Sequence, residues 1–314
     1  VAYAYDLRIF FYYLKNHNDK FIARLSETDF EAKDLDLIKA KDIEKFSEYL
    51  SYYELPDYRN PEKLIVYSNS SKGKSRKLST LRSFYKYYYK REIIITNPTA
   101  LVDLPKLHEK PIVRLDVNEV ADLLDAVEDG EKLSGSQKKY HAKTYPRDVA
   151  LIALMLGTGI RISECAGLNI SDFDFEDGSF VVTRKGGDRS ILFLPEEVKE
   201  ILEDYLKEYR LKIKALSAKD ADALFLSLQK KRMGVSSIEK MVKKYTKGVV
   251  PLKNISPHKF RSTFGTNLYA QTGDIYLVAD ILGHKDVNTT RKHYAATEEN
   301  RRRDAAKEVK LRKE

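Results

Sequence analysis

The sequence predicts a mainly α-helical chain with one small antiparallel β-sheet, in which an all-helical first domain is followed by an α+β second domain. Large apolar residues recur at intervals of three and four over much of the chain, which is the period of an amphipathic helix. One stretch, residues 179–194, instead alternates on both sides of a Gly-Gly pair, as a β-hairpin does. Prolines punctuate residues 97–111, which favours an extended linker. We therefore expect a helical domain at 1–106, a linker at 107–112 and an α+β domain at 113–314.

The composition indicates a folded protein with a polyanionic partner. The 314 residues are 42% hydrophobic, enough for a real core, and the net charge of +9 favours binding to nucleic acid or to an anionic membrane. The longest apolar run, 149–156, is far shorter than a membrane span, and the start shows no signal-peptide pattern. The single cysteine, Cys165, excludes an internal disulfide, is compatible with a reducing cytoplasm and is expected to pack in the core. Because no Cys/His set has the spacing of a zinc site, we expect no metal.

The first domain is expected to contain several amphipathic helices. They cover residues 1–15, 41–52 and 78–91, and the polar, basic stretch 68–77 is expected to be an exposed loop. The chain begins without methionine and inside the first of these helices, as it would if an N-terminal segment had been removed.

A basic stripe without an intervening acidic residue runs along this loop and the helix after it. Its members are Lys72, Lys74, Arg76, Lys77, Arg82, Lys86, Lys90 and Arg91. A charged helix face is usually only solvated, but the absence of compensating acids favours contact with a phosphate backbone. A second basic helix, 236–245, carries Lys243 and Lys244 and could likewise enter a groove or follow phosphates.

The core of the second domain is expected to centre on a nearly all-apolar helix at 147–156. Gly157 and Gly159 are expected to end this helix in a left-handed conformation. Before it, residues 116–127 form an amphipathic helix that opens with a capping box, and residues 130–144 are expected to be a polar loop.

Residues 256–294 hold the side chains that most strongly indicate chemistry. His258 and Arg261 lie one helical turn apart, and His284 and Tyr294 follow in the same segment. A guanidinium can hold two phosphate oxygens at once, a histidine can donate to an oxyanion or move a proton, and a tyrosine can become a covalent phosphoryl carrier. Taken alone, an H-x-x-R pair is more often solvated helix surface.

Two further cations precede this segment. Arg161 follows the glycine turn at the expected start of a helix, where it is either a capping arginine or a phosphate clamp aided by the helix N-terminus. Glu164 lies one turn later and could orient this arginine. Lys185 stands at the turn of the expected hairpin, a place where most lysines are only solvated.

Together these residues carry a resemblance to a known family. The ordered set consists of Arg161, Lys185, His258, Arg261, His284 and Tyr294. It resembles that of the tyrosine recombinase or phage-integrase family, and within it the Xer and simple integrase branch. The pattern NP…LPK at 97–106 also resembles the link between the two domains of Xer-like proteins, and the likeness covers nearly the whole chain. It implies a core-binding domain, whose DNA-facing helix is 78–91, and a catalytic domain that closes with it as a C-shaped clamp around double-stranded DNA.

The resemblance also implies a reaction. Tyr294 would attack a DNA phosphate and form a 3′-phosphotyrosyl bond, while Lys185 protonates the leaving 5′ oxygen. The two arginines and His284 would bind the non-bridging oxygens, and His258 would accept the tyrosine proton or help to hold the phosphate. Bond energy is kept in the covalent link, so no ATP, metal or other cofactor is implied. The expected partners are DNA and further protomers, as a dimer on a site and a tetramer in the synapse, in the cytoplasm with the nucleoid.

The position of the tyrosine departs from the common family pattern. Tyr294 lies ten positions after His284, where many members have nine, and His293 occupies the ninth position. We retain Tyr294 because histidine would be an unusual nucleophile in this family, and we expect His293 to be a neighbour of the site. Tyr269 and Tyr276 are alternatives, on helices that are expected to be packed.

The hairpin turn is a second departure. It is one residue shorter than the common KGxxxR form of the family. Arg184 therefore remains a rival of Lys185 for the cation that the turn presents.

Three functions fit these residues. The leading one is a site-specific recombinase, either for integration and excision of a mobile element or for resolution of chromosome or plasmid dimers; both roles need the same residues. A type IB topoisomerase uses a similar tyrosine and cations, but the helical first domain and the proline-rich link argue against it. A DNA-binding regulator that kept the fold and lost the chemistry is opposed only by the intact residue set. A short charged helix at 298–310 could be exchanged with a neighbouring protomer, as in family members.

Overall fold

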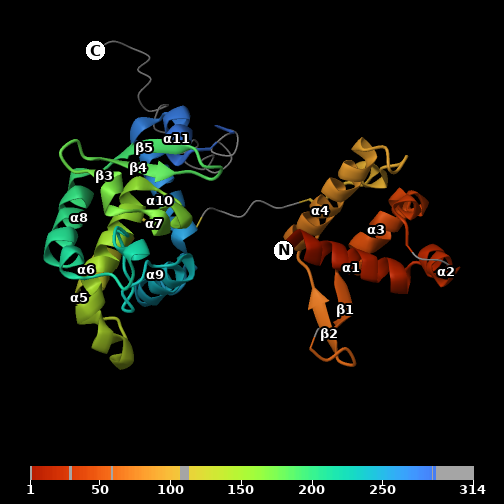
Figure 1. The fold of residues 1–314 in the computed structure, drawn as a ribbon, viewed down its shortest axis with the longest axis horizontal. Helices are drawn as coiled ribbons and strands as arrows, with labels where there is room; N and C mark the ends of the chain where they lie inside the picture. Colours follow the sequence, from red (N-terminus) through yellow and green to blue (C-terminus); the bar gives the residue numbers. More distant parts are fainter. Residues whose placement is uncertain (1, 28–29, 58, 107–112, 285, 288–314) are drawn as a thin grey trace, which may run out of the picture. The chain divides into compact units, whose positions relative to one another are not determined.

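In the computed structural model the chain divides into two compact units, Val1–Lys110 and Pro111–Glu314 (Figure 1). The structure describes residues 2–27, 30–57, 59–106, 113–284 and 286–287. Both units are mainly helical, and each has a small antiparallel sheet, so the predicted mainly α fold class is confirmed.

The first unit is held by an aromatic core between its helices. Its elements are α1 (Ala2–His17), α2 (Asp19–Glu27), α3 (Ala40–Tyr49), β1 (Tyr52–Pro56), β2 (Leu64–Ser68) and α4 (Ser71–Lys90), with 3-10 turns at Ala32–Leu37 and Pro98–Leu101. Helix α1 packs against α2 and α4. Phe10 of α1 makes edge-on contacts with Phe46 of α3 and Tyr85 of α4, at ring-centroid distances of 5.0 and 6.4 Å. Such aromatic contacts add to the free energy gained by burying the rings.

The first unit contains a β-hairpin, so the prediction that it is all-helical is wrong. Strands β1 and β2 pair antiparallel, and Tyr53 stacks on Tyr67 across the pair at 5.4 Å. Tyr53 and Leu55 are buried while Tyr52 is 64% exposed, which is the alternation of a strand. Tyr, Ile and Val favour strands, and here that preference prevails over the helical spacing expected up to residue 52.

Helix α4 begins at Ser71, inside the stretch that was expected to be a loop, 68–77. Ser70 is its N-cap, and the hydroxyl of Ser70 accepts a hydrogen bond from the backbone N–H of Gly73 at 3.4 Å. The polar residues that resemble a loop are therefore a cap and a first turn, and the loop prediction is wrong over 71–77.

The second unit is arranged around one buried helix. Its elements are α5 (Val117–Asp129), α6 (Gly135–Thr158), α7 (Ile162–Gly167), β3 (Phe173–Asp174), β4 (Ser179–Thr183), β5 (Arg189–Phe193), α8 (Glu196–Glu208), α9 (Val235–Val249), α10 (Pro257–Thr272) and α11 (Ile275–Leu282), with 3-10 turns at Ile170–Asp172, Arg210–Lys212 and Ala218–Asp220. Helix α6 contacts α5, α8 and α10 (Figure 1). Its residues 149–155 are all buried, so the predicted centre of the core is confirmed.

The start of α6 differs from the prediction. The helix begins at Gly135, within the stretch 130–144 that was expected to be a loop. A capping box explains the difference, because the N–H of Ser134 donates to the side chain of Gln137 at 3.0 Å. The helix then runs through Pro146 without ending.

The two glycines at the end of α6 have different roles. Gly159 ends the helix in the left-handed conformation, with φ of +63°, as predicted. Gly157 instead remains inside the helix, where a Cβ would lie 2.5 Å from Cγ2 of Val198 on α8. Gly157 therefore allows close packing of α6 on α8 and does not break α6, contrary to the prediction.

The sheet of the second unit has the order β3-β4-β5, and all of its pairs are antiparallel. The hairpin expected over 179–194 is confirmed. Phe180, Val182 and Leu192 face the core, whereas Ile191 and Phe193 are 65% and 68% exposed.

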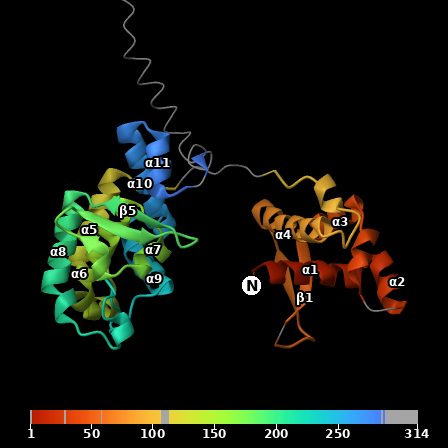
Figure 2. The ribbon, with the colours of Figure 1, turned by 45° about the horizontal axis from the view of Figure 1, so that its top comes forward.

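Helices α10 and α11 lie side by side (Figure 2). Tyr269 of α10 packs with Val278 and Leu282 of α11 in a small apolar cluster. Helix α10 is also tied to the segment before α5, because the hydroxyl of Thr263 accepts the N–H of Leu115 at 3.0 Å. None of the described helices is long and apolar enough to cross a membrane.

Candidate active site

The C-terminal end of α11 is a tight turn that requires glycine. Gly283 has φ of +60°, and the N–H groups of Gly283 and His284 donate to the carbonyls of Asp280 and Ala279, at 2.8 and 2.9 Å. A Cβ on Gly283 would lie 3.1 Å from Nε of Arg184. The last carbonyls of a helix have no donor within that helix, so they need partners from elsewhere.

Three arginines supply these partners, each from a different part of the second unit. They donate to three successive carbonyls: Arg184 Nη2 to Ile281 at 2.8 Å, Arg261 Nη2 to Leu282, and Arg161 Nη2 to Gly283 at 3.1 Å. We name Arg161, Arg184 and Arg261 the arginine cluster. A helix C-terminus carries partial negative charge, which attracts cations to it. The cluster therefore fixes the backbone that leads directly into His284.

Arg261, on α10, joins the C-terminal ends of two other helices through one guanidinium. Besides the α11 carbonyl, it binds the carbonyl of Gly159 at 2.8 Å, at the end of α6, and its own residue is only 7% exposed. A Cβ on Gly159 would lie 2.4 Å from Phe264 of α10, so glycine also allows α10 to approach this turn. The guanidinium of Arg261 is thus held in place before any substrate binds, which is the preorganisation that electrostatic catalysis requires.

Glu164 is a buried carboxylate shared by two members of the cluster. Its side chain is 2% exposed, Oε1 accepts from Arg161 Nη1 at 2.7 Å and Oε2 accepts from Arg184 Nη1 at 3.2 Å. Oε2 also accepts the backbone N–H of Arg161 at 2.8 Å, which closes the N-terminal cap of α7. Glu164 thereby holds Arg161 in one orientation, and the side chain of Arg161 remains 27% exposed.

The turn between β4 and β5 places two neighbouring cations in opposite environments. Arg184 has a side chain that is 8% exposed and points inward to the cluster, whereas Lys185 is exposed at the tip. The N–H of Arg184 donates to the carbonyl of Asp188 at 2.7 Å, and its carbonyl accepts the N–H of Gly187 at 3.1 Å. Within the described residues, Nε of Arg184 is buried and has no hydrogen-bond partner. Of the two rivals, Lys185 is therefore the one that can reach a substrate.

The two histidines of the predicted set are each close in sequence to a contact of the cluster. His258 is exposed in the first turn of α10, three residues before Arg261 on the same helix. His284 is partly buried and directly follows the carbonyl that Arg161 binds. The structure thus brings His284 together with Arg161 and Arg261, and it places His258 one turn away from Arg261.

The predicted nucleophile and its neighbour, Tyr294 and His293, lie outside the described residues. Of the two alternatives, Tyr269 is buried at 6% exposure, as expected for a packed residue. Helix α11 packs through Val278 and Leu282, as expected, but Tyr276 lies on its other side and is 71% exposed. Tyr276 needs its own control in any test of the nucleophile.

On α4, three of the predicted phosphate-binding side chains instead hold the first unit together. Arg76 donates to both carboxylate oxygens of Asp6, at 2.5 and 2.6 Å, and Lys77 donates to Asn69 at 2.8 Å. Arg82 donates to the carbonyls of Thr99 and Val102. Burial lowers the pKa of Lys77. Lys74 donates to Ser51 at 2.5 Å, while Lys72 and Lys86 are exposed. The acid that compensates this helix comes from α1, 70 positions away in sequence from Arg76.

The two lysines predicted to contact DNA on α9 also differ. Lys243 is exposed. The ammonium of Lys244 lies 3.2 Å from Oδ2 of Asp148, a fully buried residue of α6. The hydroxyl of Tyr245 donates to the same carboxylate oxygen at 2.9 Å. Desolvation lowers the pKa of Lys244 although Asp148 opposes the shift. Lys244 is therefore part of the α6–α9 contact.

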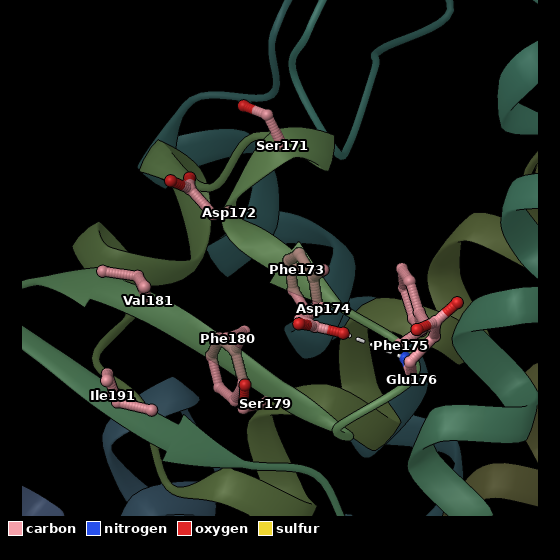
Figure 3. Close-up of a pocket in the computed structure, with 10 residues that line it drawn as sticks. All are labelled: Ser171, Asp172, Phe173, Asp174, Phe175, Glu176, Ser179, Phe180, Val181 and Ile191. Atoms are coloured by element: carbon pink, nitrogen blue, oxygen red, sulfur yellow. Dashed lines mark hydrogen bonds between the residues drawn. The ribbon is translucent and has the colours of Figure 1, made fainter.

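A separate hollow lies between the segment after α7 and the strands β4 and β5 (Figure 3). Its polar groups serve local turns: Asp174 accepts the N–H of Glu176 at 3.0 Å, and Asp172 accepts the N–H of Asn169 at 2.8 Å. No member of the arginine cluster lines this hollow, so it is not the candidate site.

Two other chemistries have little support in the described part of the chain. Cys165 is 1% exposed, and burial raises the pKa of its thiol, so the thiolate that reacts is disfavoured there, as its packing role predicts. In the ranges that the structure describes, no group of three or more His, Cys, Asp or Glu side chains could hold a metal ion.

Sequence reasoning found most of these side chains but missed what joins them. Arg184 was only a rival of Lys185, and its bridge between Glu164 and the end of α11 was not expected. The sequence signal that could have indicated an inward role is the short turn, in which an arginine directly follows the strand. The convergence on three successive carbonyls has no sequence signal, because it depends on how α7, β4 and α10 are placed around α11.

The chain is similar to a known protein family and to several known proteins. The model of the phage integrase family matches residues 113–301. The tyrosine recombinase XerC of Caldanaerobacter subterraneus is 32% identical over all of this chain and 82% of its own length. Among solved structures, the XerH recombinase bound to its difH substrate, as a pre-cleavage complex, has a TM-score of 0.63 at 21% identity, covering 93% of this chain and 74% of XerH. The Tn1549 transposon integrase in complex with a circular intermediate DNA has a TM-score of 0.62 at 22% identity, covering 95% of this chain and 97% of the integrase.

Proposed function

Since this chain belongs to the phage integrase family and is a site-specific tyrosine recombinase, we propose that the arginine cluster is the centre at which it cuts and rejoins DNA. One observation carries the proposal. Arg161 and Arg261, which lie 100 positions apart, meet at successive carbonyls of the turn that precedes His284. Arg161, Arg261 and His284, which can all donate to a phosphate, thus lie in one small region of the second unit.

These donors suit the transition state of phosphoryl transfer, in which charge spreads over the non-bridging oxygens. Arg161 uses two of its five N–H donors on Glu164 and Gly283 and is partly exposed, so it can also donate to a phosphate. Because Glu164 and the α11 carbonyls fix the guanidinium groups beforehand, the site needs little reorganisation when the charge develops.

The proposed reaction keeps the number of phosphodiester bonds constant. The hydroxyl oxygen of Tyr294 attacks phosphorus and forms the Oη–P bond, and its proton passes to His258. The bond from phosphorus to the 5′ oxygen breaks, and Lys185 gives the leaving oxygen a proton. Attack by the 5′ hydroxyl of a partner strand on the phosphotyrosine reverses these transfers and completes strand exchange.

We further propose that both units contact double-stranded DNA. On α4 the exposed lysines Lys72 and Lys86 are the best candidates for phosphate contacts, and on α9 the exposed Lys243 is. The solved relatives named above are bound to DNA, which supports DNA as the partner of this chain. A dimer on each site and a tetramer in the synapse follow from the need to bring four strands together, and residues 298–310 are the candidate segment for exchange between protomers.

The relatives support two biological roles. One is an Xer recombinase and another is a transposon integrase, so either dimer resolution or the movement of a mobile element is the proposed outcome of the same chemistry. Both roles place the protein on cytoplasmic DNA with the nucleoid. No observation favours a topoisomerase or an inactive regulator.

The test is covalent capture of the enzyme on DNA. Wild type would first select its site from a randomised duplex pool, and a nicked suicide version of that site would then be incubated with each variant and resolved on a denaturing gel. We expect wild type, His293→Ala, Tyr269→Phe and Tyr276→Phe to form a DNA–protein adduct and Tyr294→Phe to form none. An adduct that survives Tyr294→Phe would contradict the assignment of the nucleophile. Specific binding by wild type with no adduct would contradict the reaction.

A further inference from the structure

We propose that Arg184 is a positioning residue that couples Lys185 to the arginine cluster. The inference rests on the proposed function, in which Lys185 protonates the leaving 5′ oxygen. It concerns the residue that sets where Lys185 stands relative to the groups that hold the phosphate.

The side chain of Arg184 is anchored at two places that belong to the site. Nη1 binds Glu164 at 3.2 Å, and Glu164 also binds Arg161. Nη2 binds the carbonyl of Ile281 at 2.8 Å, three residues before His284. One guanidinium therefore fixes the distance from the end of β4 to both α7 and the end of α11.

The backbone of Arg184 is anchored to the turn that carries Lys185. Its N–H and its carbonyl bind Asp188 and Gly187, at 2.7 and 3.1 Å, so both of its polar backbone groups are used to close the turn. Gly186 and Gly187 have φ of +112° and +94°, values that glycine adopts readily. Lys185 is thus the first residue of a glycine-containing turn, and the side chain of the preceding residue, Arg184, holds that turn against Glu164 and the end of α11.

The local chemistry favours positioning over simple stabilisation. Nε of Arg184 is buried without a partner among the described residues. By contrast Arg210, which is also buried, donates from Nε, Nη1 and Nη2 to three carbonyls. A buried donor without an acceptor is unfavourable, and an apolar side chain of the same length would avoid it. The two bonds that Arg184 does make both lead to catalytic groups.

Sulfur substitution at the leaving atom gives a direct test. In a suicide duplex whose bridging 5′ oxygen is replaced by sulfur, the leaving group is a thiolate, which needs no proton because a thiol has a pKa of about 8.5. Loss of Lys185 function should therefore slow adduct formation on the oxygen duplex and not on the sulfur duplex. Lys185→Ala provides the reference pattern, and single-turnover rates on both duplexes are measured for each variant on the selected site.

We expect Arg184→Met to slow adduct formation on the oxygen duplex roughly 10- to 100-fold, as misplacement of a reacting group by about 1 Å does. The sulfur duplex should restore the wild-type rate. Arg184→Lys keeps the charge but cannot bridge Glu164 and Ile281 as a planar guanidinium can. We expect it to slow adduct formation on the oxygen duplex less than Arg184→Met does, with the wild-type rate again restored on the sulfur duplex. Arg184→Lys replaces Arg184→Met in the test if Arg184→Met does not fold. Arg210→Met is the matched control, and we expect its ratio of sulfur to oxygen rates to equal that of wild type.

Other outcomes overturn the inference. Equal slowing of Arg184→Met on both duplexes would show that Arg184 acts on the phosphate-binding arginines or on the fold and not through Lys185. Wild-type rates on both duplexes would show that it positions nothing. Failure of wild type to form an adduct on either duplex would instead overturn the proposed function, and the inference with it.

Discussion

Arg210 and the arginine cluster use the same interaction, a guanidinium on backbone carbonyls, in two different ways. Arg210 is 3% exposed, and its three acceptors, Ile213, Ala221 and Ala223, all lie within one stretch of about ten residues beside it. Its hydrogen bonds order a local loop. The members of the cluster come from three distant segments and meet at one helix end, beside a shared carboxylate. The comparison indicates that convergence from separate elements, more than burial, distinguishes a site from a structural anchor.

The largest effect is expected from removing Arg261. Arg261→Ala should lower the single-turnover rate of adduct formation about 10²- to 10³-fold, because a preorganised donor to the transition state is lost. Arg210→Ala should leave that rate unchanged below its melting temperature, because its donors serve only a loop. The comparison between site and anchor would be broken by equal rate losses in the two variants.

Glu164→Gln should next affect stability and activity together. Two guanidinium groups then lose their buried counter-charge, and breaking a buried ion pair costs about 3–5 kcal/mol. We expect a matching decrease in the free energy of unfolding by urea titration, together with slower adduct formation by the fraction that remains folded. A variant as stable as wild type would mean that Glu164 does not balance the charge of Arg161 and Arg184.

Gly283→Ala tests the turn that the cluster holds. A side chain at φ of +60° costs about 1–2 kcal/mol, and its Cβ would press on Arg184 at 3.1 Å. The melting temperature should fall by a few degrees, as a loss of about 1–2 kcal/mol implies, while adduct formation slows more than this small loss of stability explains. Gly178→Ala, also at positive φ but with open space around its Cβ, is the matched control and should keep the wild-type rate.

The smallest effects are expected on α4, where the same distinction applies. Lys86→Ala should weaken DNA binding and reduce the slope of log affinity against log salt by about 1, because one phosphate contact is lost. Arg76→Ala should instead lower the stability of the first unit, because the buried Asp6 loses its charged partner and keeps only the Thr80 hydroxyl, while the salt slope stays the same. Fluorescence anisotropy at several salt concentrations separates the two. A change in salt slope for Arg76→Ala would show that Arg76 also reaches DNA.

Much of the fold was predictable because local patterns determine it. Residues 149–155 of α6 form a continuous apolar run, and residues 179–194 alternate as a hairpin does, so both are recognisable in the sequence. The errors lie at helix starts, where Ser70 and Ser134 with the residues after them resemble loops until their caps are seen. The hairpin in the first unit was missed because tyrosines occur with both helical and strand spacing there.

The candidate site was predictable as a set of residue types and not as an arrangement. Arg161, His258 and Arg261 stand out by their spacing, but nothing local shows that Arg76 pairs with Asp6 or that Arg184 reaches Glu164. Such partners are far apart in sequence and depend on tertiary packing. For the same reason a basic run indicates charge but does not show which cations remain available to a ligand.

The most direct test of the account is to locate the DNA on the protein after covalent capture. The adduct formed on a suicide duplex would be digested with nuclease and trypsin, and the peptide 293–301, which carries both His293 and Tyr294, would be sequenced by fragmentation mass spectrometry. The account predicts a nucleotide phosphate on Tyr294, removed by Tyr294→Phe. The same phosphate on His293, on Tyr276 or on any other residue would contradict it.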